Sequence, residues 1–425
     1  MKPVLIQGGR VIDPSRGFDA VADVLLRDGR IEAVEANIAA EDVETVDASG
    51  KVVAPGLVDV HVHFREPGKE DAETVATGAR SAAAGGFTSV CAMPNTDPVT
   101  DNQAAVGFIV KQANAADSAR VYPYGTISIG QKGEHLAPFA KLIEAGAIAV
   151  SDDGHPVRSS HLMRTALEYA QVFGIPVADH CEEPSLASGA MHEGVVASRL
   201  GLRAIPAAAE EIMVARDVIL SELTAGHIHL CHMSTRGSVD IIRRAKERGV
   251  NVTAEVTPHH LTLTHAECEG FNTNAKMNPP LREEADVAAL RAALQDGTLD
   301  MIATDHAPHH YEAKERDFDE APFGIVGLET ALGLCVKDLV NGGVLSLPEL
   351  VNRMSTEPAR VFHLDAGTLQ VGKPGDVVVF DADATWTVDP TQFYSKSRNT
   401  PYAGHTLTGM VERTVVGGRT VFERK

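Results

Sequence analysis

The feature that most constrains this chain is an alternation of short apolar segments with longer amphipathic ones. Eight short segments rich in β-branched residues predict strands, at 57–63, 88–93, 120–126, 147–151, 176–180, 227–232, 251–255 and 300–305. Alanine- and leucine-rich segments between many of them predict helices, for example 71–84, 161–173, 208–223, 238–248 and 284–294. Strands that alternate with helices form parallel sheets. Eight such units predict an α/β fold with a closed (β/α)8 barrel of the TIM type.

The two ends of the chain have a different character. Short predicted strands punctuated by glycine fill the first fifty-odd residues and return in the last sixty, and Asp28-Gly29 is a good hairpin signal. Because these segments flank the barrel on both sides, we expect them to pair into one small β-sandwich domain. We therefore assign residues 1–54 plus 366–425 to this β domain and residues 55–365 to the barrel.

Composition excludes several classes of partner. The formal net charge is -20, from 38 basic and 58 acidic side chains, which argues against nonspecific binding to nucleic acid or anionic membranes. No apolar run approaches the roughly 18 residues of a membrane helix, and the first residues do not resemble a signal peptide. The five cysteines are scattered and form no C-x-x-C pair. They predict reduced thiols and a cytoplasmic location.

The candidate chemistry lies at the ends of the predicted strands, where barrel enzymes carry their active sites. Five of the eight strands end in imidazole or carboxylate groups that suit zinc or a similar cation: His61, His63, Asp153, His180, His232 and Asp305. Each of these residues alone has an ordinary structural explanation. Together, at equivalent ends of one barrel, they predict a metal site.

Six protein ligands exceed what one tetrahedral zinc takes while keeping an open position. Two zinc ions about 3.5–4 Å apart fit better. We expect one ion on His61, His63 and Asp305, the other on His180 and His232, with Asp153 bridging the pair. Such a pair acidifies a bound water molecule. Asp305 is then the predicted catalytic residue, a general base that takes the proton from the attacking water and returns it to the leaving nitrogen.

Other polar residues are predicted to contact the substrate. Arg65 follows the His61–His63 pair directly, and a guanidinium at the mouth of the site would hold a carboxylate bidentately. Asn95 ends the second strand and offers amide hydrogen bonds. The polar segment 307–324 contains His309 and Lys314, and a loop of this length after a barrel strand is typical of a lid or binding loop.

These residues resemble the amidohydrolase superfamily and, within it, the long bacterial-type dihydroorotases. The H-x-H pair alone marks only the superfamily, whereas Phe-Arg-Glu-Pro-Gly at 64–68 and Asn-Pro-Pro-Leu-Arg at 278–282 are more specific. The resemblance covers essentially the whole chain, and its motifs are VVAPGLVD at 52–59, HVHFREPG at 61–68, MPNT at 93–96, DDG at 152–154, KMNPPLR at 276–282 and ATDHAPH at 303–309.

The resemblance implies reversible, metal-dependent cyclisation of N-carbamoyl-L-aspartate to L-dihydroorotate, a step of pyrimidine synthesis. Carried over position by position, it also implies a set of substrate contacts, the last two of them through the backbone: His63, Phe64, Arg65, Asn95, Asn278, His309, Phe323 and Gly324. It leaves open a homodimer and a complex with aspartate transcarbamoylase.

One departure from the superfamily pattern bears on the alternatives. Many members bridge their metals with a carboxylated lysine after the fourth strand, where this chain has Asp153 and no lysine. That difference separates the chain from its nearest rivals, the hydantoinases and allantoinases. A second alternative is a non-catalytic companion of aspartate transcarbamoylase. Such a chain would lack ligand histidines; all six ligand residues are present here, so we expect activity.

Overall fold

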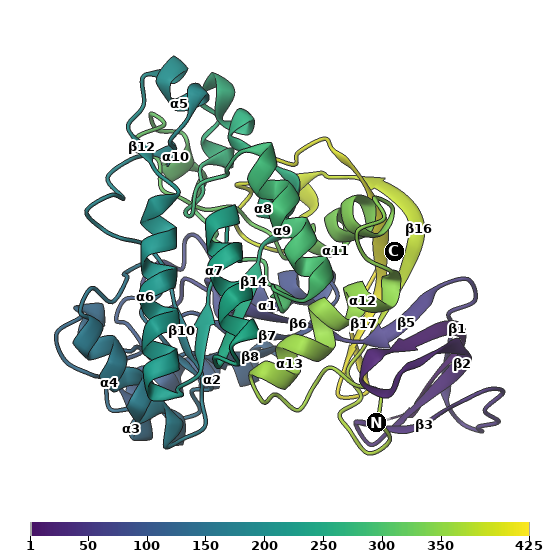
Figure 1. Cartoon of the computed structure of the whole chain (residues 1–425). Coiled ribbons are helices and arrows are strands. Elements are labelled where there is room, and N and C mark those ends of the chain that lie inside the picture. The colour runs from purple at the N-terminus through teal and green to yellow at the C-terminus, as the bar shows by residue number, and fades with distance from the viewer. Residues whose placement is uncertain (1, 425) are drawn as a thin grey trace.

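All eight predicted barrel strands occur in the computed structural model, which describes residues 2–424 (Figure 1). They are β6 (Leu57–Val62), β7 (Phe87–Ala92), β8 (Arg120–Pro123), β9 (Val150–Ser151), β10 (Val177–Asp179), β13 (Ile228–Leu230), β14 (Val252–Val256) and β15 (Met301–Ile302). Parallel pairing runs through β6-β7-β8 and through β9-β10-β13-β14-β15. Parallel bridges from Gly125 to Val150 and from Val62 to His306 join these two sheets, which closes the predicted barrel.

The five predicted helices also occur and surround the strands: α1 (Val75–Ala84), α4 (Ser160–Gln171), α6 (Ala208–Thr224), α7 (Arg236–Glu247) and α9 (Glu284–Asp296). The first begins four residues later than predicted, because the side chain of Thr74 accepts a hydrogen bond from the backbone N–H of Thr77 and caps the helix. In α7, Val239 and Ile242 face the barrel at helical spacing.

The remaining helices complete the ring or lie above the barrel. They are α2 (Gln103–Ala116), α3 (Phe139–Glu144), α5 (Val195–Leu200), α8 (Pro258–Thr262), α10 (Tyr311–Lys314), α11 (Ala331–Cys335), α12 (Leu347–Val351) and α13 (Glu357–Val361). A two-stranded sheet of β11 (Met191–His192) and β12 (Ala204–Ile205) lies beside α5. Within residues 2–424, no helix is both long and apolar enough to cross a bilayer.

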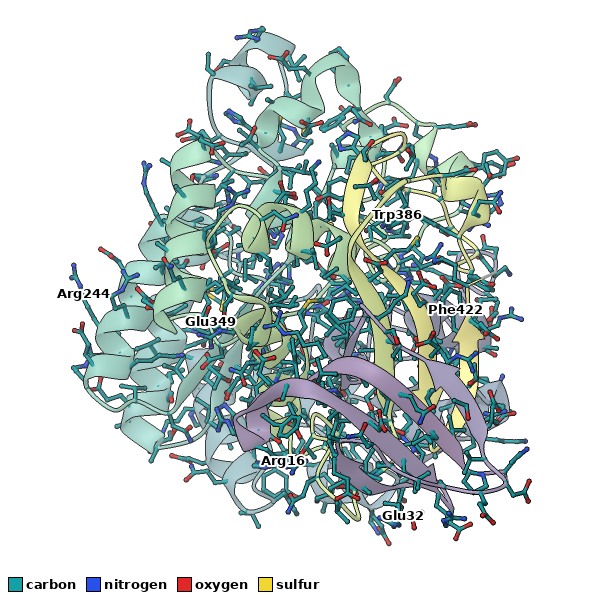
Figure 2. All side chains as sticks on the ribbon, turned by 90° about the vertical axis from the view of Figure 1, so that its right-hand side faces the viewer. Arg16, Glu32, Arg244, Glu349, Trp386 and Phe422 are labelled. Carbon is teal, nitrogen blue, oxygen red and sulfur yellow. The ribbon has the colours of Figure 1, made fainter. Side chains whose placement is uncertain are left out.

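The two chain ends form one sheet, as predicted. Its order is β18-β17-β16-β5-β1-β2-β3, with β4 paired to β1. Its strands are β1 (Val4–Asp13), β2 (Phe18–Arg27), β3 (Arg30–Glu35), β4 (Glu44–Asp47), β5 (Val52–Pro55), β16 (Val377–Thr387), β17 (Thr406–Val416) and β18 (Arg419–Glu423). In Figure 2 the purple N-terminal strands meet the yellow C-terminal ones, where Trp386 and Phe422 are labelled.

A glycine pair lets this sheet bend around its own core. The register of β1 shifts between Ile6 and Gly9, and there β1 changes its parallel neighbour from β4 to β5. Gly8 has a φ of 71°, and a Cβ at Gly9 would lie 2.5 Å from Val53, so side chains are disfavoured at both positions. Buried side chains from both arms of the bent sheet, such as Val24 and Val377, share one cluster.

Candidate active site

Most of the predicted site residues meet in one cavity of about 210 Å³ at the mouth of the barrel, where the carboxyl ends of its strands converge. Each reaches this place because it directly follows a barrel strand or lies in the loop beyond it. The cavity is lined by His63, Arg65, Asn95, Asp153, His180, His232, Asn278, Asp305, His309 and Phe323, together with Gly154, Met277 and Ala307. His61 lies behind this lining and is fully buried.

Two predicted contacts lie behind the lining. The ring of Phe64 packs in the core against Gly78, where an added Cβ would come within 2.2 Å of it. Position 64 can therefore reach a ligand only through its main chain. Gly324 packs against the pocket wall, and a Cβ there would lie 2.6 Å from the carbonyl oxygen of Ala307 and 2.7 Å from the ring of His309.

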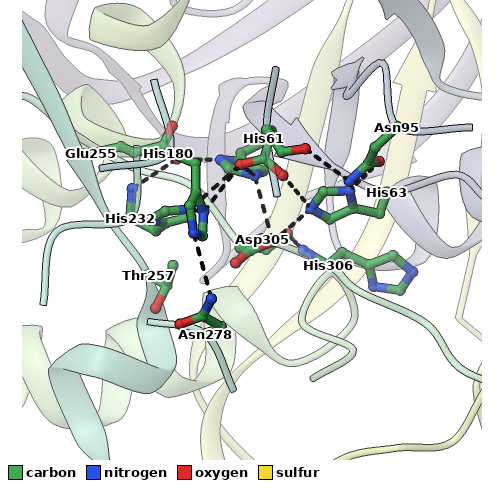
Figure 3. A network of polar contacts seen from close by, with 12 residues as sticks. His61, His63, Asn95, His180, His232, Glu255, Thr257, Asn278, Asp305 and His306 are labelled. Carbon is green, nitrogen blue, oxygen red and sulfur yellow. Dashed lines mark hydrogen bonds and ion pairs between the residues drawn. The ribbon is translucent and has the colours of Figure 1, made fainter. Parts of the chain in front are cut away.

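His61 and His63, at the end of β6, face the carboxylates of Asp153 and Asp305. Figure 3 labels both histidines and Asp305. His61 Nε2 lies 3.5 Å from Asp153 Oδ1 and 3.5 Å from Asp305 Oδ1. His63 Nε2 lies 3.0 Å from Asp305 Oδ1 and 3.4 Å from Asp153 Oδ2. The two carboxylates come from β9 and β15, which are far apart in sequence. The barrel brings them to one point.

The other two histidines complete the cluster around Asp153. His232 Nε2 lies 3.5 Å and His180 Nδ1 lies 3.7 Å from Asp153 Oδ1, and the two ring nitrogens are 2.9 Å apart. Asp153 thus contacts all four histidines, which is the arrangement expected of a bridging ligand.

These residues fit a metal centre of the zinc class. Nitrogen and oxygen ligands about 2.0–2.1 Å from one tetrahedral ion lie roughly 3.3 Å apart, and the cluster shows 3.0–3.7 Å between its facing nitrogen and oxygen atoms. His61 Nε2 and Asp153 Oδ1 are buried and make no hydrogen bond to any described residue. Buried polar atoms without a partner are costly, so these two atoms are explained if they hold an ion.

Neighbouring hydrogen-bond acceptors fix the tautomers of His61 and His63. Asn95 Oδ1 lies 2.9 Å from His63 Nδ1, and Glu255 Oε1 lies 2.5 Å from His61 Nδ1. An acceptor at Nδ1 places the proton there and leaves the Nε2 lone pair directed at the carboxylates, as a metal ligand requires. Glu255 also contacts His229 Nε2 at 3.1 Å.

The contact of Glu255 with His61 was missed in the sequence, although a signal was present. A carboxylate in the apolar strand β14, Val-Thr-Ala-Glu-Val, needs a buried partner. That partner, His61, is 194 residues away, so only the fold identifies it.

The charged groups of this cluster shift one another's pKa values. Burial alone would lower the pKa of His61, but Glu255, Asp153 and Asp305 outweigh it and raise that pKa well above its ordinary value. Burial would raise the pKa of Asp305, yet His61 and His63 bring it down to about 2. The pKa of Asp153 is likewise held well below its ordinary value, because His61 outweighs burial. The carboxylates are therefore ionised at neutral pH and available as ligands.

We expect Glu255→Gln to weaken metal binding by about 10- to 100-fold, the usual effect of losing a partner that orients a ligand histidine. A glutamine amide presents an N–H group to one of the two histidines and cannot accept from both. Competition with a chromogenic chelator measures the affinity, and Glu247→Gln at the exposed end of α7 is the matched control. Equal affinity of the variant and wild type would show that Glu255 has no orienting role.

Two further clusters of metal-ligating side chains do not fit an ion. His192, His265 and Glu283 lie close together, but the guanidinium of Arg282 donates to His192 Nδ1 at 3.1 Å. The other ring nitrogen of a neutral His192 then carries the proton and has no free lone pair.

The second cluster, Asp179, Cys181 and Asp217, already contains a cation. Arg216 lies 3.1 Å from Asp179 Oδ2 and 2.6 Å from Asp217 Oδ1. The guanidinium takes the place that a metal ion would need.

Comparisons with known proteins agree with this geometry. Residues 50–238 match the dihydro-orotase-like family, and residues 240–422 match the amidohydrolase family. The dihydroorotase of Geobacter metallireducens is 52% identical over 423 residues, covering 99% of this chain and 100% of that protein. The dihydroorotase of Anaeromyxobacter dehalogenans is 54% identical over 424 residues, covering 99% and 98%.

Solved structures share the fold. L-hydantoinase from Arthrobacter aurescens superposes with a TM-score of 0.88 at 28% identity, over 100% of this chain and 96% of that one. Dihydropyrimidinase from Brevibacillus agri superposes with a TM-score of 0.85 at 24% identity, over 99% and 95%. The barrel, the terminal sheet and the ligand cluster together define a metal-dependent amidohydrolase. Because the full-length identity to dihydroorotases exceeds 50%, the chain belongs to the dihydroorotase family.

Proposed function

We propose that this chain catalyses the reversible interconversion of N-carbamoyl-L-aspartate and L-dihydroorotate in pyrimidine synthesis. The position of Arg65 is the observation that supports this substrate, because its side chain lines the cavity beside Asp305 and the histidine cluster. Among the described residues, no carboxylate lies within ion-pair distance of its guanidinium. Burial lowers the pKa of Arg65 to about 10, so it stays cationic at neutral pH. A ring substrate with a carboxylate supplies the missing anion.

The pocket wall orients this guanidinium. Arg65 Nε donates to the carbonyl oxygen of Pro308 at 3.1 Å, which leaves the terminal N–H groups for a bidentate carboxylate. His309 Nε2 lies 2.7 Å from the carbonyl oxygen of Phe323. A carbonyl can only accept, so Nε2 carries the proton of a neutral His309 and Nδ1 is an acceptor. We propose that this acceptor receives a ring N–H of the substrate.

Asp305 is the proposed proton carrier. In the hydrolytic direction, water oxygen adds to the ring carbonyl and the carboxylate of Asp305 takes the proton that the water loses. The carbon–nitrogen bond then breaks, and Asp305 returns that proton to the leaving nitrogen. Because His61 and His63 keep Asp305 ionised, its protonated form is a strong acid that gives the proton up readily.

The proposed cofactor is a pair of zinc ions. One ion would be held by His61, His63 and Asp305. The other would be held by His180 and His232, and Asp153 would bind both ions. When bound, the pair would acidify a water molecule and polarise the ring carbonyl. Asn278 Nδ2 lies 3.5 Å from His180 Nε2, and Asn278 also lines the cavity. It is therefore next to the proposed site of the second ion and to the substrate.

Chelation should abolish turnover. We expect removal of the metal to lower activity by about 10³-fold or more, since several kcal/mol of charge stabilisation are lost, and added Zn²⁺ to restore it. Elemental analysis should find two zinc ions per chain, and the melting temperature should fall on chelation because the ions bind only the folded chain. Full turnover by protein shown to be metal-free would contradict the proposal.

A substrate panel tests the reaction itself. We expect hydrolysis of L-dihydroorotate and cyclisation of N-carbamoyl-L-aspartate, with kcat/KM for hydantoin and allantoin lower by about 10²-fold or more, because these rings lack the carboxylate that Arg65 would bind. The reverse preference would favour a hydantoinase-like or allantoinase-like enzyme. Inactivity of the zinc-loaded chain on every ring would favour the non-catalytic companion of aspartate transcarbamoylase.

The remaining proposals concern location and assembly. All five cysteines are buried and free, which supports a reducing compartment such as the cytoplasm. A homodimer and a complex with aspartate transcarbamoylase stay predictions from the family resemblance. Light scattering of the purified chain, alone and mixed with the transcarbamoylase, tests both.

A further inference from the structure

The loop 307–324, predicted as a lid or binding loop, is tied down at both ends by one buried side chain. Asn399, 4% exposed, donates its Nδ2 to the carbonyl oxygens of Ala307 and Gly324, both at 3.0 Å. Its Oδ1 accepts from the backbone N–H of His309 at 3.1 Å. The segment that follows β16 thereby positions the part of the loop that borders the cavity.

A buried lysine anchors the same loop from within. Lys314, at the end of α10, is 5% exposed. Its Nζ lies 2.8 Å from the carbonyl oxygen of Pro322, 3.1 Å from that of Gly324 and 3.4 Å from that of Lys276. Three acceptors match the three N–H groups of an ammonium, whereas a neutral amine has only two. The contacts therefore call for the charged form.

A second buried lysine lies behind the first. Lys276, 2% exposed, donates to the carbonyl oxygens of Phe318 and Asp319 at 2.6 and 3.1 Å. Its Nζ also lies 4.7 Å from the ring centroid of Phe323, a residue of the cavity wall. Among the described residues, no carboxylate oxygen lies within 4.0 Å of the Nζ atom of Lys276 or of Lys314.

Buried cations without an anion are costly, and proteins normally pair them. Burial and the charge of Lys276 lower the pKa of Lys314 to about 7, which reflects this cost. The charge of Lys314 also acts on His309 in the cavity wall. Burial lowers the pKa of His309 most, followed by the charge of Arg65 and then by that of Lys314. An anion in the cavity would compensate the lysine and the arginine together.

We propose that Lys314 determines specificity for carboxylate-bearing substrates. Its ammonium holds the Gly324 backbone against His309 and adds a second positive charge behind the one that Arg65 presents. The cavity then favours a ring with a carboxylate over the same ring without one. This inference rests on the proposed function, and it assigns Lys314 no contact with the reacting atoms.

The test compares two inhibitors of dihydroorotate turnover: orotate, which carries the carboxylate, and uracil, which lacks it. Inhibition constants are measured for the wild type, K314M and K337M, since Lys337 is an exposed control. We expect K314M to raise the inhibition constant of orotate on the order of tenfold and to change that of uracil by less than about twofold. K337M should change neither inhibition constant. An equal loss for both ligands, or no loss for orotate, would overturn the proposal.

If K314M does not fold, as judged by circular dichroism, R65M carries the test. Its Lys314 is intact, so orotate should still inhibit more strongly than uracil. Equal inhibition by the two ligands would overturn the proposal. A wild-type chain that does not turn over dihydroorotate rejects the proposed function itself, whereas an active wild type with unchanged K314M selectivity rejects only the role of Lys314.

Discussion

Replacing Asp305 with asparagine should lower kcat for dihydroorotate hydrolysis by about 10³- to 10⁴-fold, at the upper end of what loss of a general acid–base group costs. Asparagine keeps the size of the side chain but cannot take the proton from water or return it to nitrogen. Asp305 Oδ1 lies 3.0 Å from His63 Nε2, so the two atoms can hold one ion, and a neutral amide would hold that ion less firmly than a carboxylate. The effect should fall on kcat more than on KM, because the proton moves only in the chemical steps.

The measurement needs the metal content of the variant, since Asp305 is also a proposed ligand. Turnover is therefore compared at equal zinc occupancy, established by elemental analysis. Asp317→Asn, on the exposed part of the following loop, is the matched control and should behave as the wild type. Undiminished turnover in Asp305→Asn would refute the proton-transfer role.

Replacing Arg65 with methionine should raise KM for dihydroorotate and for carbamoyl aspartate by about 10²- to 10³-fold, which lies within the roughly 2–5 kcal/mol lost with one partner of a buried charge pair. Methionine keeps much of the apolar length but offers no N–H groups. Arg65→Lys should recover only part of the loss, because an ammonium cannot bind a carboxylate in the bidentate way of a guanidinium.

Steady-state kinetics separate this effect from a general disturbance. Arg316→Met, an exposed position in the neighbouring loop, should leave KM unchanged. Any residual activity on hydantoin, which has no carboxylate, should survive Arg65→Met. A parallel loss on hydantoin and on dihydroorotate would mean that Arg65 supports the pocket without binding the carboxylate.

The barrel and the meeting of the six proposed ligands at its mouth were predictable because both depend on local patterns. Strand and helix periodicities are set by neighbouring residues, and the carboxyl ends of parallel strands must meet at one edge of a barrel. Residues that end strands, such as His61, His180 and Asp305, could therefore be placed together without coordinates. Element boundaries were less accurate, as at α1, because the cap formed by Thr74 is decided by one hydrogen bond.

Some of the predicted substrate contacts line the cavity and others do not. Arg65 and Asn95 follow strands and do line the cavity. Phe64, their neighbour, turns its ring into the core against Gly78. Sequence position shows which segment reaches the mouth of the barrel, but the direction of each side chain beyond a strand end depends on what it packs against.

The pattern of residues thus specified the βα alternation, the paired β segments at the two termini and the six proposed ligands at the strand ends, since each of these follows from local periodicity and strand direction. It did not specify that Glu255 contacts His61, that Asn399 holds the backbone at Gly324, or that Lys314 lies buried with no carboxylate of residues 2–424 within ion-pair distance. The first two contacts join residues that are 194 and 75 positions apart, and Lys314 also reaches the carbonyl oxygen of Lys276, 38 positions away. No periodicity connects such positions, and they meet only when the closed barrel and the returning C-terminal segment bring them together.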